Sequence, residues 1–152
     1  GLIGTGSTGI QAVPAIAERA AQLTVFQRTP NYSVPARNAP LTPEFKRWVK
    51  DNFAEIRKAM QGTTNGHAFF PRDQSALEVS EAEREALYEA AWKKGGMQFR
   101  ATFRDILTSK AANDTASDFI RRKIRETVKD AETARKLMPL DHPYAAKRPP
   151  ID

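Results

Sequence analysis

The sequence contains no cysteine among its 152 residues. Without cysteine there can be no disulfide scaffold, no thiolate zinc site and no cysteine nucleophile. No apolar run approaches the roughly 18–20 residues needed to span a bilayer, and no signal-peptide pattern opens the chain. We therefore expect no membrane partner and a cytoplasmic location.

Histidine is also scarce, with two in the chain. His67 and His142 are not accompanied by the carboxylate or cysteine pattern that a metal site needs. We predict no metal site and place both histidines at the surface or in loops.

Positive charge is in excess, with 24 Lys and Arg against 18 Asp and Glu, a net charge of +6. The excess lies toward the two ends, in residues 1–37 and 121–152, whereas residues 38–120 are balanced. A nucleic-acid binder more often shows a basic stripe interleaved with aromatic residues. The chain has only a small basic cluster at residues 121–125, so we predict no nucleic-acid partner.

The first quarter of the chain alternates strand and helix patterns. An apolar strand ends at Ile3, a glycine-rich turn follows, and helical spacing predicts a helix from about Ser7 to Ala21, kinked at Pro14. The β-branched and apolar residues 23–27 predict a second strand. Residues 28–43 contain four prolines and predict an extended connection.

The next hundred residues have helical character. Thr42 and Pro43 predict a helix start, and an apolar stripe continues from Phe45 to Met60. A loop over 61–79 is followed by a capping box at residues 80–83, whose helix ends at the glycines 95–96. Further helices are predicted around 99–107, after a cap at Asn113 or Asp114, and after a cap at Asp130. We expect the apolar stripes of all these helices to form core.

This order predicts an α/β fold, namely a partial Rossmann-type dinucleotide-binding unit (strand–GxGxxG–helix–strand) interrupted by a mainly α-helical insertion. The first part of this dinucleotide-binding unit is assigned to residues 1–37, the insertion to 38–141 and the return segment to 142–152. Because the sequence opens inside a strand pattern and stops where another could begin, we expect it to be an internal piece of a longer protein.

The turn Gly4-Thr5-Gly6-Ser7-Thr8-Gly9 has the context that a dinucleotide fold requires, because it follows a strand and opens a helix. Gly4 permits a tight turn, Gly6 lets backbone amides approach a pyrophosphate, and Gly9 lets helix and strand pack closely. The pyrophosphate would lie at the helix N-terminus, where free N–H groups and the helix dipole favour negative charge.

The end of the second strand distinguishes between cofactors. NAD sites place Asp or Glu there to accept from the ribose 2′-hydroxyl, whereas this chain has Gln27, Arg28 and Thr29. A guanidinium can bind a phosphate with two parallel hydrogen bonds, and a threonine hydroxyl can donate a third. The sequence therefore favours NADP(H) over NAD(H).

Three segments together resemble type I Baeyer–Villiger monooxygenases, and most closely the cyclohexanone monooxygenase branch. They are Gly4-Thr5-Gly6-Ser7-Thr8-Gly9-Ile10-Gln11, residues 24–32 (TVFQRTPNY) and Lys147-Arg148-Pro149-Pro150. The segments 92–103 and 136–139 are similar to that branch as well, so the resemblance runs along essentially the whole chain in one register.

The resemblance implies an enzyme that uses NADPH and FAD to insert one oxygen atom of O2 into a ketone through a flavin peroxide, giving an ester or lactone. FAD would be bound mainly by parts of the parent chain that are absent here, so the isolated segment is expected to be inactive, with the rest of its parent chain as a partner. By position, Arg148 resembles the catalytic arginine that stabilises the negatively charged peroxide. The resemblance implies cofactor-binding roles for Gly4, Thr5, Gly6, Ser7, Thr8, Gly9, Gln11, Arg28, Thr29 and Lys147.

Three alternatives stay open. A flavin monooxygenase that oxidises nitrogen or sulfur uses a related layout of two dinucleotide-binding domains. An NADP-dependent dehydrogenase would need a Tyr-x-x-x-Lys pair or a metal site, and none of the three tyrosines has a lysine four residues on. A basic helical module that binds nucleic acid would show steeply salt-dependent binding.

Overall fold

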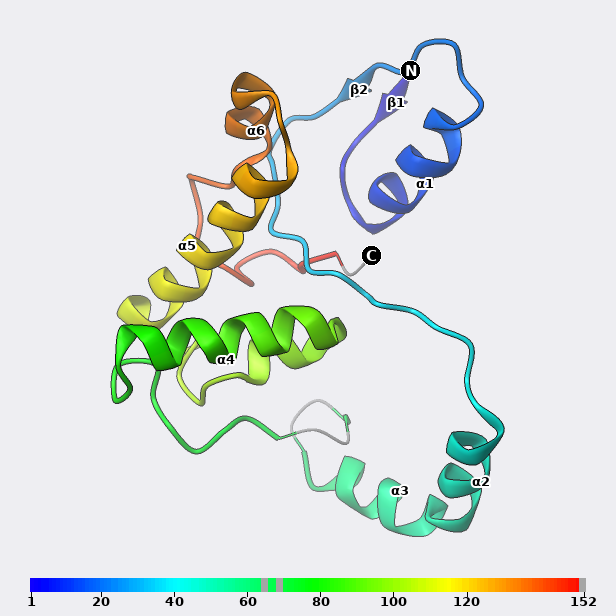
Figure 1. Cartoon of the computed structure of the whole chain (residues 1–152), viewed down its shortest axis with the longest axis vertical. Helices are drawn as coiled ribbons and strands as arrows, with labels where there is room; N and C mark the ends of the chain where they lie inside the picture. The colour runs from blue at the N-terminus through cyan, green and yellow to red at the C-terminus, as the bar shows by residue number, and fades with distance from the viewer. Residues whose placement is uncertain (64–65, 68–69, 151–152) are drawn as a thin grey trace.

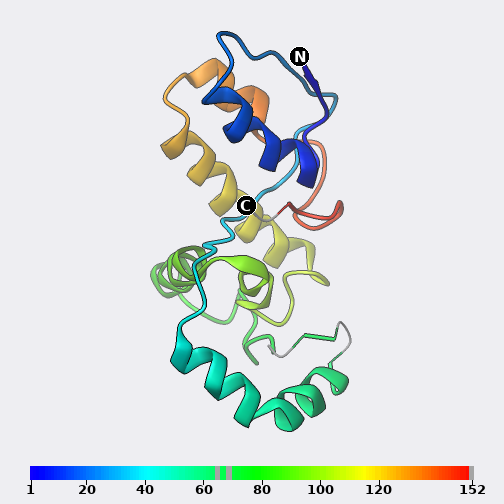
Figure 2. The same ribbon diagram turned by 90° about the vertical axis from the view of Figure 1, so that its right-hand side faces the viewer.

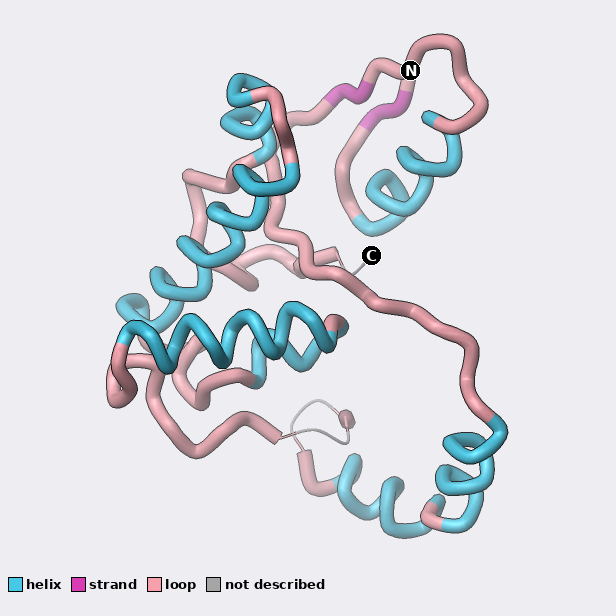
Figure 3. The backbone as a smooth tube through the Cα atoms, viewed as in Figure 1, coloured by secondary structure: helices cyan, strands magenta, loops and turns pink. Residues whose placement is uncertain are grey.

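The computed structural model describes residues 1–63, 66–67 and 70–150. Within these residues the chain is mostly helical, with a small parallel sheet of two strands (Figures 1 and 3). In the same part of the chain no helix is long and apolar enough to cross a bilayer. The elements are β1 (Leu2–Ile3), α1 (Ser7–Ala17), β2 (Val25–Phe26), α2 (Pro43–Asp51), α3 (Phe53–Gln61), α4 (Glu81–Lys94), the 3₁₀ helix η1 (Gly96–Ala101), α5 (Lys110–Thr127) and α6 (Ala131–Leu137).

The two strands pair in parallel and are connected through α1, which packs on β1. Leu2 lies opposite Val25 in the register. The ladder continues beyond the strand ends, because the amide of Gly4 donates to the carbonyl of Phe26 over 2.9 Å. The glycine-rich turn therefore begins at the end of β1, beside the end of β2.

Helix α1 is shorter than the sequence predicts, ending at Ala17 instead of Ala21. Pro14 lies inside it and lacks an amide hydrogen. The carbonyl of Ile16 accepts from both Arg19 and Ala20, and residues 18–21 are exposed. Because these last residues bury no apolar surface, nothing offsets the entropy of extending the helix.

The core lies where α4, η1 and α5 meet, and it is built from aromatic rings. Tyr88 of α4 stacks on Phe99 of η1 and contacts Phe103 and Phe119, with all three ring centroids 5.3–5.4 Å from its own. Tyr144 from the C-terminal segment closes the cluster against Phe99. This packing confirms the prediction of an apolar core for the helices after residue 80.

Side-chain caps set most helix starts. Thr42, Ser80 and Asp130 accept from the amides of Phe45, Glu83 and Thr133, as the sequence predicts. The prediction of a cap at Asn113 or Asp114 is wrong, because Ser109 caps α5. Asn113 is instead buried in α5, where its amide group binds backbone groups of Ile106 and Tyr144.

The predicted helix over 99–107 is also wrong. Residues 96–101 form a 3₁₀ helix and the following residues form turns. Phe99, Phe103 and Ile106 are all buried in the aromatic core, so packing from several sides determines their backbone conformation. Tertiary contacts of this kind override local helical spacing.

The predicted single stripe from Phe45 to Met60 is broken into the helices α2 and α3. The break is at Asn52, whose backbone leaves the helical conformation. Its side-chain amide donates to the carbonyl of Trp48 over 2.8 Å. In the described chain these two helices contact each other but no other helix or strand, forming an arm at the far end from β1 and β2 (Figures 1 and 2). The prediction that this stripe is core is therefore wrong, since Trp48 is 51% exposed and Phe53 is 59% exposed. Part of the predicted 61–79 loop, at residues 64–65 and 68–69, lies outside the described residues.

The return segment runs back beside the chain that follows β2. The amide of Val34 and the hydroxyl of Ser33 both donate to the carbonyl of Pro150, at 3.2 and 3.3 Å. In the described part of the return segment, these hydrogen bonds are made with residues 31–34, which follow β2. The last two residues of the predicted return segment, 151–152, are outside the described part.

Candidate functional site

The glycine-rich turn has the backbone geometry that a close turn requires. Gly4 has a φ of +95°, a region that favours glycine. A Cβ atom at Gly9 would overlap the carbonyl oxygen of Gly4 and touch the Leu2 side chain. Gly9 therefore permits α1 to approach the turn and β1, as the motif predicts.

Gly6, the N-cap of α1, is open on its outer side. No atom of the described chain lies within 4 Å of the position a Cβ would take there. No side chain caps α1, and its first turn contains no acidic residue. The first backbone amides of α1 thus lack a side-chain acceptor and face a site where negative charge would be favoured.

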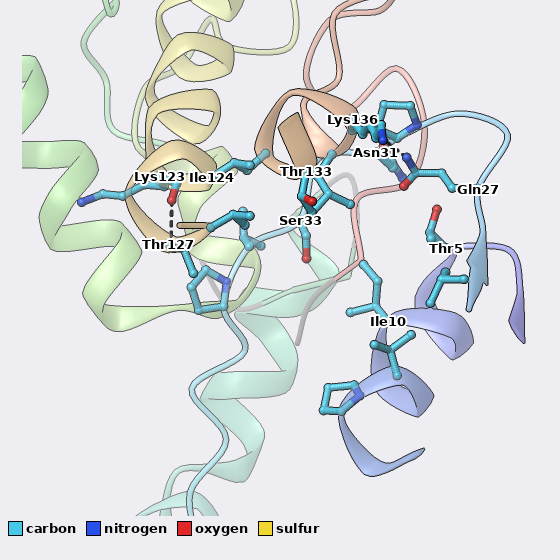
Figure 4. Close-up of a pocket in the computed structure, with 18 of the residues that line it drawn as sticks. Thr5, Ile10, Gln27, Asn31, Ser33, Lys123, Ile124, Thr127, Thr133 and Lys136 are labelled. Carbon is cyan, nitrogen blue, oxygen red and sulfur yellow. Dashed lines mark hydrogen bonds between the residues drawn. The ribbon is translucent and has the colours of Figure 1, made fainter. Parts of the chain in front are cut away.

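A cavity of about 960 Å³ is lined on one side by α1, β2 and the residues that follow β2, and on the other side by α5 and α6. Figure 4 shows Thr5 and Ile10 on the side of α1, and Lys123, Ile124 and Thr127 on the side of α5. The wall from α1 is apolar, whereas Gln27 and Arg28 line the cavity at the end of β2. Gln27 also donates to the carbonyl of Lys136 over 2.9 Å, which ties the end of β2 to α6.

The lining of this cavity carries cations but no Asp or Glu among its described residues. Lys123 is paired with Glu89 and Glu126, and Lys136 with Glu132. Arg28, by contrast, has no ion-pair or hydrogen-bond partner within the described chain and is exposed. It is thus free to bind an anion without breaking an existing pair.

A second hollow has a volume of about 720 Å³ and shares Val34 with the lining of the first cavity. It is lined by Ser7 and Gln11 of α1, by Arg100 of η1 and by Arg148 of the return segment. Met97, Leu107 and Tyr144 supply apolar wall. The structure therefore divides the predicted site residues, with Thr5 and Arg28 at the first cavity and Ser7, Gln11 and Arg148 at the second.

The six other predicted residues line neither space among the described residues. Gly4 and Gly9 act in the turn, while Thr29 is half-buried and Lys147 is exposed. The Lys147 ammonium contributes to lowering the pKa of Asp141, although the hydrogen bond from His142 is the larger cause. Thr8 and Gly6 are exposed at the start of α1.

The backbone that carries Arg148 is fixed by side chains of distant elements. Asn31 donates from its side-chain amide to the carbonyl of Arg148 over 2.9 Å. Tyr32, fully buried, donates to the carbonyl of His142 over 3.0 Å and accepts from Arg121 of α5. The guanidinium of Arg148 is thus presented from an anchored backbone while its side chain stays exposed.

The two histidines both lie in loops, as predicted, but His142 is not a surface residue. Its side chain is only 10% exposed, packed edge-on against Tyr32 and bonded to Asp141. No group of three or more metal-ligating side chains occurs in the described part of the chain.

Sequence reasoning missed Asn31, Lys123, Lys136 and Arg100 as neighbours of the two spaces. Asn31 follows the Arg28-Thr29 pair closely and could have been suspected from that position. The other three belong to helices far along the chain, and no local signal distinguishes them from solvated basic residues.

Comparisons with known proteins agree with the resemblance. No family model matches the chain. It is 46% identical over 158 residues to cyclohexanone 1,2-monooxygenase of Acinetobacter sp and 43% identical over 151 residues to a Baeyer–Villiger monooxygenase of Pseudooceanicola batsensis. It is also 45% identical over 151 residues to phenazine N-monooxygenase of Lysobacter antibioticus. These matches cover 98–100% of the chain but only 27–28% of each relative.

Solved structures give the same result. An oxidised steroid monooxygenase bound to NADP matches with a TM-score of 0.93 at 50% identity, over 99% of this chain and 29% of the other. OTEMO in complex with FAD and NADP matches with a TM-score of 0.96 at 38% identity, over 99% and 28%. The relatives of this chain include Baeyer–Villiger monooxygenases, and solved structures that match it contain NADP or both FAD and NADP. Cyclohexanone monooxygenase is among them, and the chain spans about 28% of its length.

Proposed function

We propose that this chain is the NADPH-binding portion of an FAD-dependent Baeyer–Villiger monooxygenase. In this proposal residues 1–37 and 142–152 belong to a partial Rossmann-type unit, and residues 38–141 are a helical insertion. One observation carries the proposal, namely that the unpaired Arg28 and Thr5 of the glycine-rich turn line one cavity that has no lining carboxylate among the described residues. Such a site suits a dinucleotide with an additional phosphate.

The residues fit the cofactor in two places. The backbone from Gly4 to Gly9, with Thr5, Ser7, Thr8 and Gln11 beside it, would hold the pyrophosphate where no Cβ fills the space above Gly6. Arg28 and Thr29 would bind the 2′-phosphate, with Lys147 as a second cation. A carboxylate at this point would repel the phosphate, and the lining has none.

When bound, NADPH supplies reducing equivalents and FAD supplies the means of activating O2. Arg148 would stabilise negative charge on oxygen next to a ketone substrate. A guanidinium stays protonated across the physiological range, so it donates hydrogen bonds to an anion without losing its proton. The anchored backbone at Asn31 and Val34 limits how far this guanidinium can move from its position beside the second hollow.

A second candidate is an N-oxidising flavin monooxygenase, favoured by the 45% identity to phenazine N-monooxygenase. Both candidates share the NADPH site, so the NADPH preference does not separate them. The substrate that accepts the oxygen does.

The experiment replaces the matching segment of cyclohexanone 1,2-monooxygenase with this chain and assays the FAD-loaded chimera. We expect it to oxidise NADPH at least about tenfold faster than NADH, because Arg28 binds the additional phosphate, and to convert cyclohexanone to its lactone. Arg148→Lys should lose lactone formation while NADPH oxidation continues. Formation of a phenazine N-oxide with no lactone would favour the second candidate, and equal rates with NADPH and NADH would contradict both.

A further inference from the structure

We propose that the hollow beside Arg148 selects a ketone that carries a carboxylate, and that Arg100 is the residue that binds the carboxylate. This inference rests on the proposed function, because it names the class of substrate for the same enzyme. It starts from an imbalance of charge, since two guanidinium groups line the hollow and no Asp or Glu does so among the described residues.

Neither guanidinium is neutralised by another part of the described chain. Arg100 and Arg148 form no ion pair or hydrogen bond through their side chains there. Some other arginines of the chain are paired, for example Arg104 with Glu78 at 2.6 Å and Arg122 with Glu126 at 2.8 Å. What distinguishes Arg100 and Arg148 from other unpaired arginines, such as Arg28, is that these two line the same hollow.

Both arginines are held by ordered structure. Arg100 lies in η1 next to Phe99, which is 1% exposed in the aromatic core. The hydroxyl of Thr102 donates to the carbonyl of Phe99 over 2.7 Å and stabilises this turn. Arg148 is held through its carbonyl by Asn31. Two cations far apart in the sequence are thus brought to one space, which concentrates positive potential in it.

The rest of the wall indicates what the remainder of the ligand is like. Met97, Leu107 and Tyr144 present mostly apolar surface to the hollow. Burial raises the pKa of Tyr144, so its hydroxyl stays neutral near pH 7 and adds no negative charge. A volume of about 720 Å³ is within the usual range of small-molecule pockets, roughly 300–1,000 Å³. Ser7 and Gln11, assigned above to the cofactor pyrophosphate, line the α1 edge of the hollow, and the remainder suits an apolar body with one anionic group.

The two guanidiniums then have separate tasks. Arg148 faces the oxygen chemistry of the proposed reaction, whereas Arg100 binds the carboxylate with up to two parallel hydrogen bonds. This arrangement would orient the ketone relative to Arg148 and would favour a ketone acid over an uncharged ketone of the same shape.

The test titrates the full 152-residue chain, saturated with NADP+, with 3-oxocyclohexanecarboxylate, and follows binding by calorimetry. The methyl ester serves as the uncharged probe of nearly the same shape. We expect the acid to bind at least about tenfold more tightly than the ester, because charge-assisted hydrogen bonds contribute roughly twice as much as neutral ones. Arg100→Gln should remove this difference, and Arg100→Lys should keep part of it. Arg57→Gln on α3 removes the same charge far from the hollow and should leave the difference unchanged.

Two results would overturn the inference. Equal binding of acid and ester, or no saturable binding of the acid, would show that the hollow does not select a carboxylate. A loss of NADP+ affinity in Arg100→Gln, with NADP+ displacing the acid, would show that Arg100 serves a cofactor phosphate instead. The NADP+ titration itself, which depends on Arg28, reports separately on the proposed function.

Discussion

At the scale of single residues, the glycines of the turn have different physical tasks. A methyl group at Gly9 would overlap the carbonyl of Gly4, whereas at Gly6 it would meet open space. We expect Gly9→Ala to lower the free energy of unfolding by about 1–3 kcal/mol, as overpacking does. Gly6→Ala should change it by less than about 1 kcal/mol. Urea denaturation of the two variants measures both values.

Gly6→Ala should weaken the binding of NADP+ although it hardly changes the free energy of unfolding. Gly6→Ala keeps the fold but places a methyl group where the pyrophosphate would lie, so we expect weaker binding of NADP+ by at least about tenfold. Unchanged affinity in this folded variant would contradict the placement of the cofactor at the start of α1. Gly9→Ala is the comparison variant, because we expect it to lower the free energy of unfolding, whereas Gly6→Ala should lower mainly the affinity for NADP+.

How far sequence reasoning reaches also differs from residue to residue. The turn at Gly4 and the close approach at Gly9 follow from local spacing, and the structure confirms them. Asn113 shows the opposite case, because its side chain binds Tyr144 across a long sequence separation instead of capping a helix. Local patterns do not contain information about such partners.

At the scale of elements, ion pairs fasten α4 to α5. Arg122 and Lys123 of α5 pair with Glu85 and Glu89 of α4 and with Glu126 of their own helix. The hydrogen bond from Arg122, followed by that from Lys123, lowers the pKa of Glu126 below its ordinary value of 4.5. A carboxylate with a lowered pKa stabilises the fold fully above that value and loses this contribution as the pH falls below it.

We therefore expect the stability of the chain to fall with pH below 4.5, and Glu126→Gln to make this acid dependence less steep. Glu55→Gln on α3 removes one carboxylate outside the network and serves as the control. Urea midpoints measured from pH 7 to pH 3.5 or so test this, following the ordinary range of glutamate titration. If the urea midpoints of the wild type and Glu126→Gln fall identically with pH, this ion-pair network does not cause the loss of stability in acid.

The exposed arm of α2 and α3 gives a second prediction at this scale. Trp48 is 51% exposed and stacks on Phe45 within the arm, whereas Phe119 is 3% exposed in the core. Trp48→Ala should cost less than about 1 kcal/mol of unfolding free energy. Phe119→Ala should cost about 3–5 kcal/mol. Comparable losses in both variants would show that the arm contributes to the core after all.

The element boundaries show why periodicity succeeds only in part. Thr42, Ser80 and Asp130 cap their helices because a side chain and a nearby amide are enough to define a start. The stripe from Phe45 to Met60 has helical period but no surface of the described chain to cover it, so its pattern predicts a helix correctly and burial wrongly. The spacing of apolar residues shows which face of a helix is apolar. Only the tertiary structure decides whether another element covers that face.

At the scale of the whole molecule, the candidate site is assembled from the two ends and the middle of the chain. The sequence predicts the half supplied by α1, β2 and Arg28. The opposite wall comes from Lys123 and Lys136 on α5 and α6, about a hundred residues later. Long-range assembly of this kind could not be predicted from local spacing, whereas the resemblance of three separated motifs pointed to one enzyme family that the comparisons then confirmed.

The central claim is that Arg28 binds the 2′-phosphate of NADP(H), and a double-mutant cycle tests it most directly. Calorimetry measures the binding of NADP+ and NAD+ to the wild-type chain and to Arg28→Gln. We predict that the wild type prefers NADP+ and that the coupling between Arg28 and the 2′-phosphate is about 1.5–3 kcal/mol, with NAD+ affinity unchanged by the substitution. An unchanged preference for NADP+ in Arg28→Gln would contradict the account.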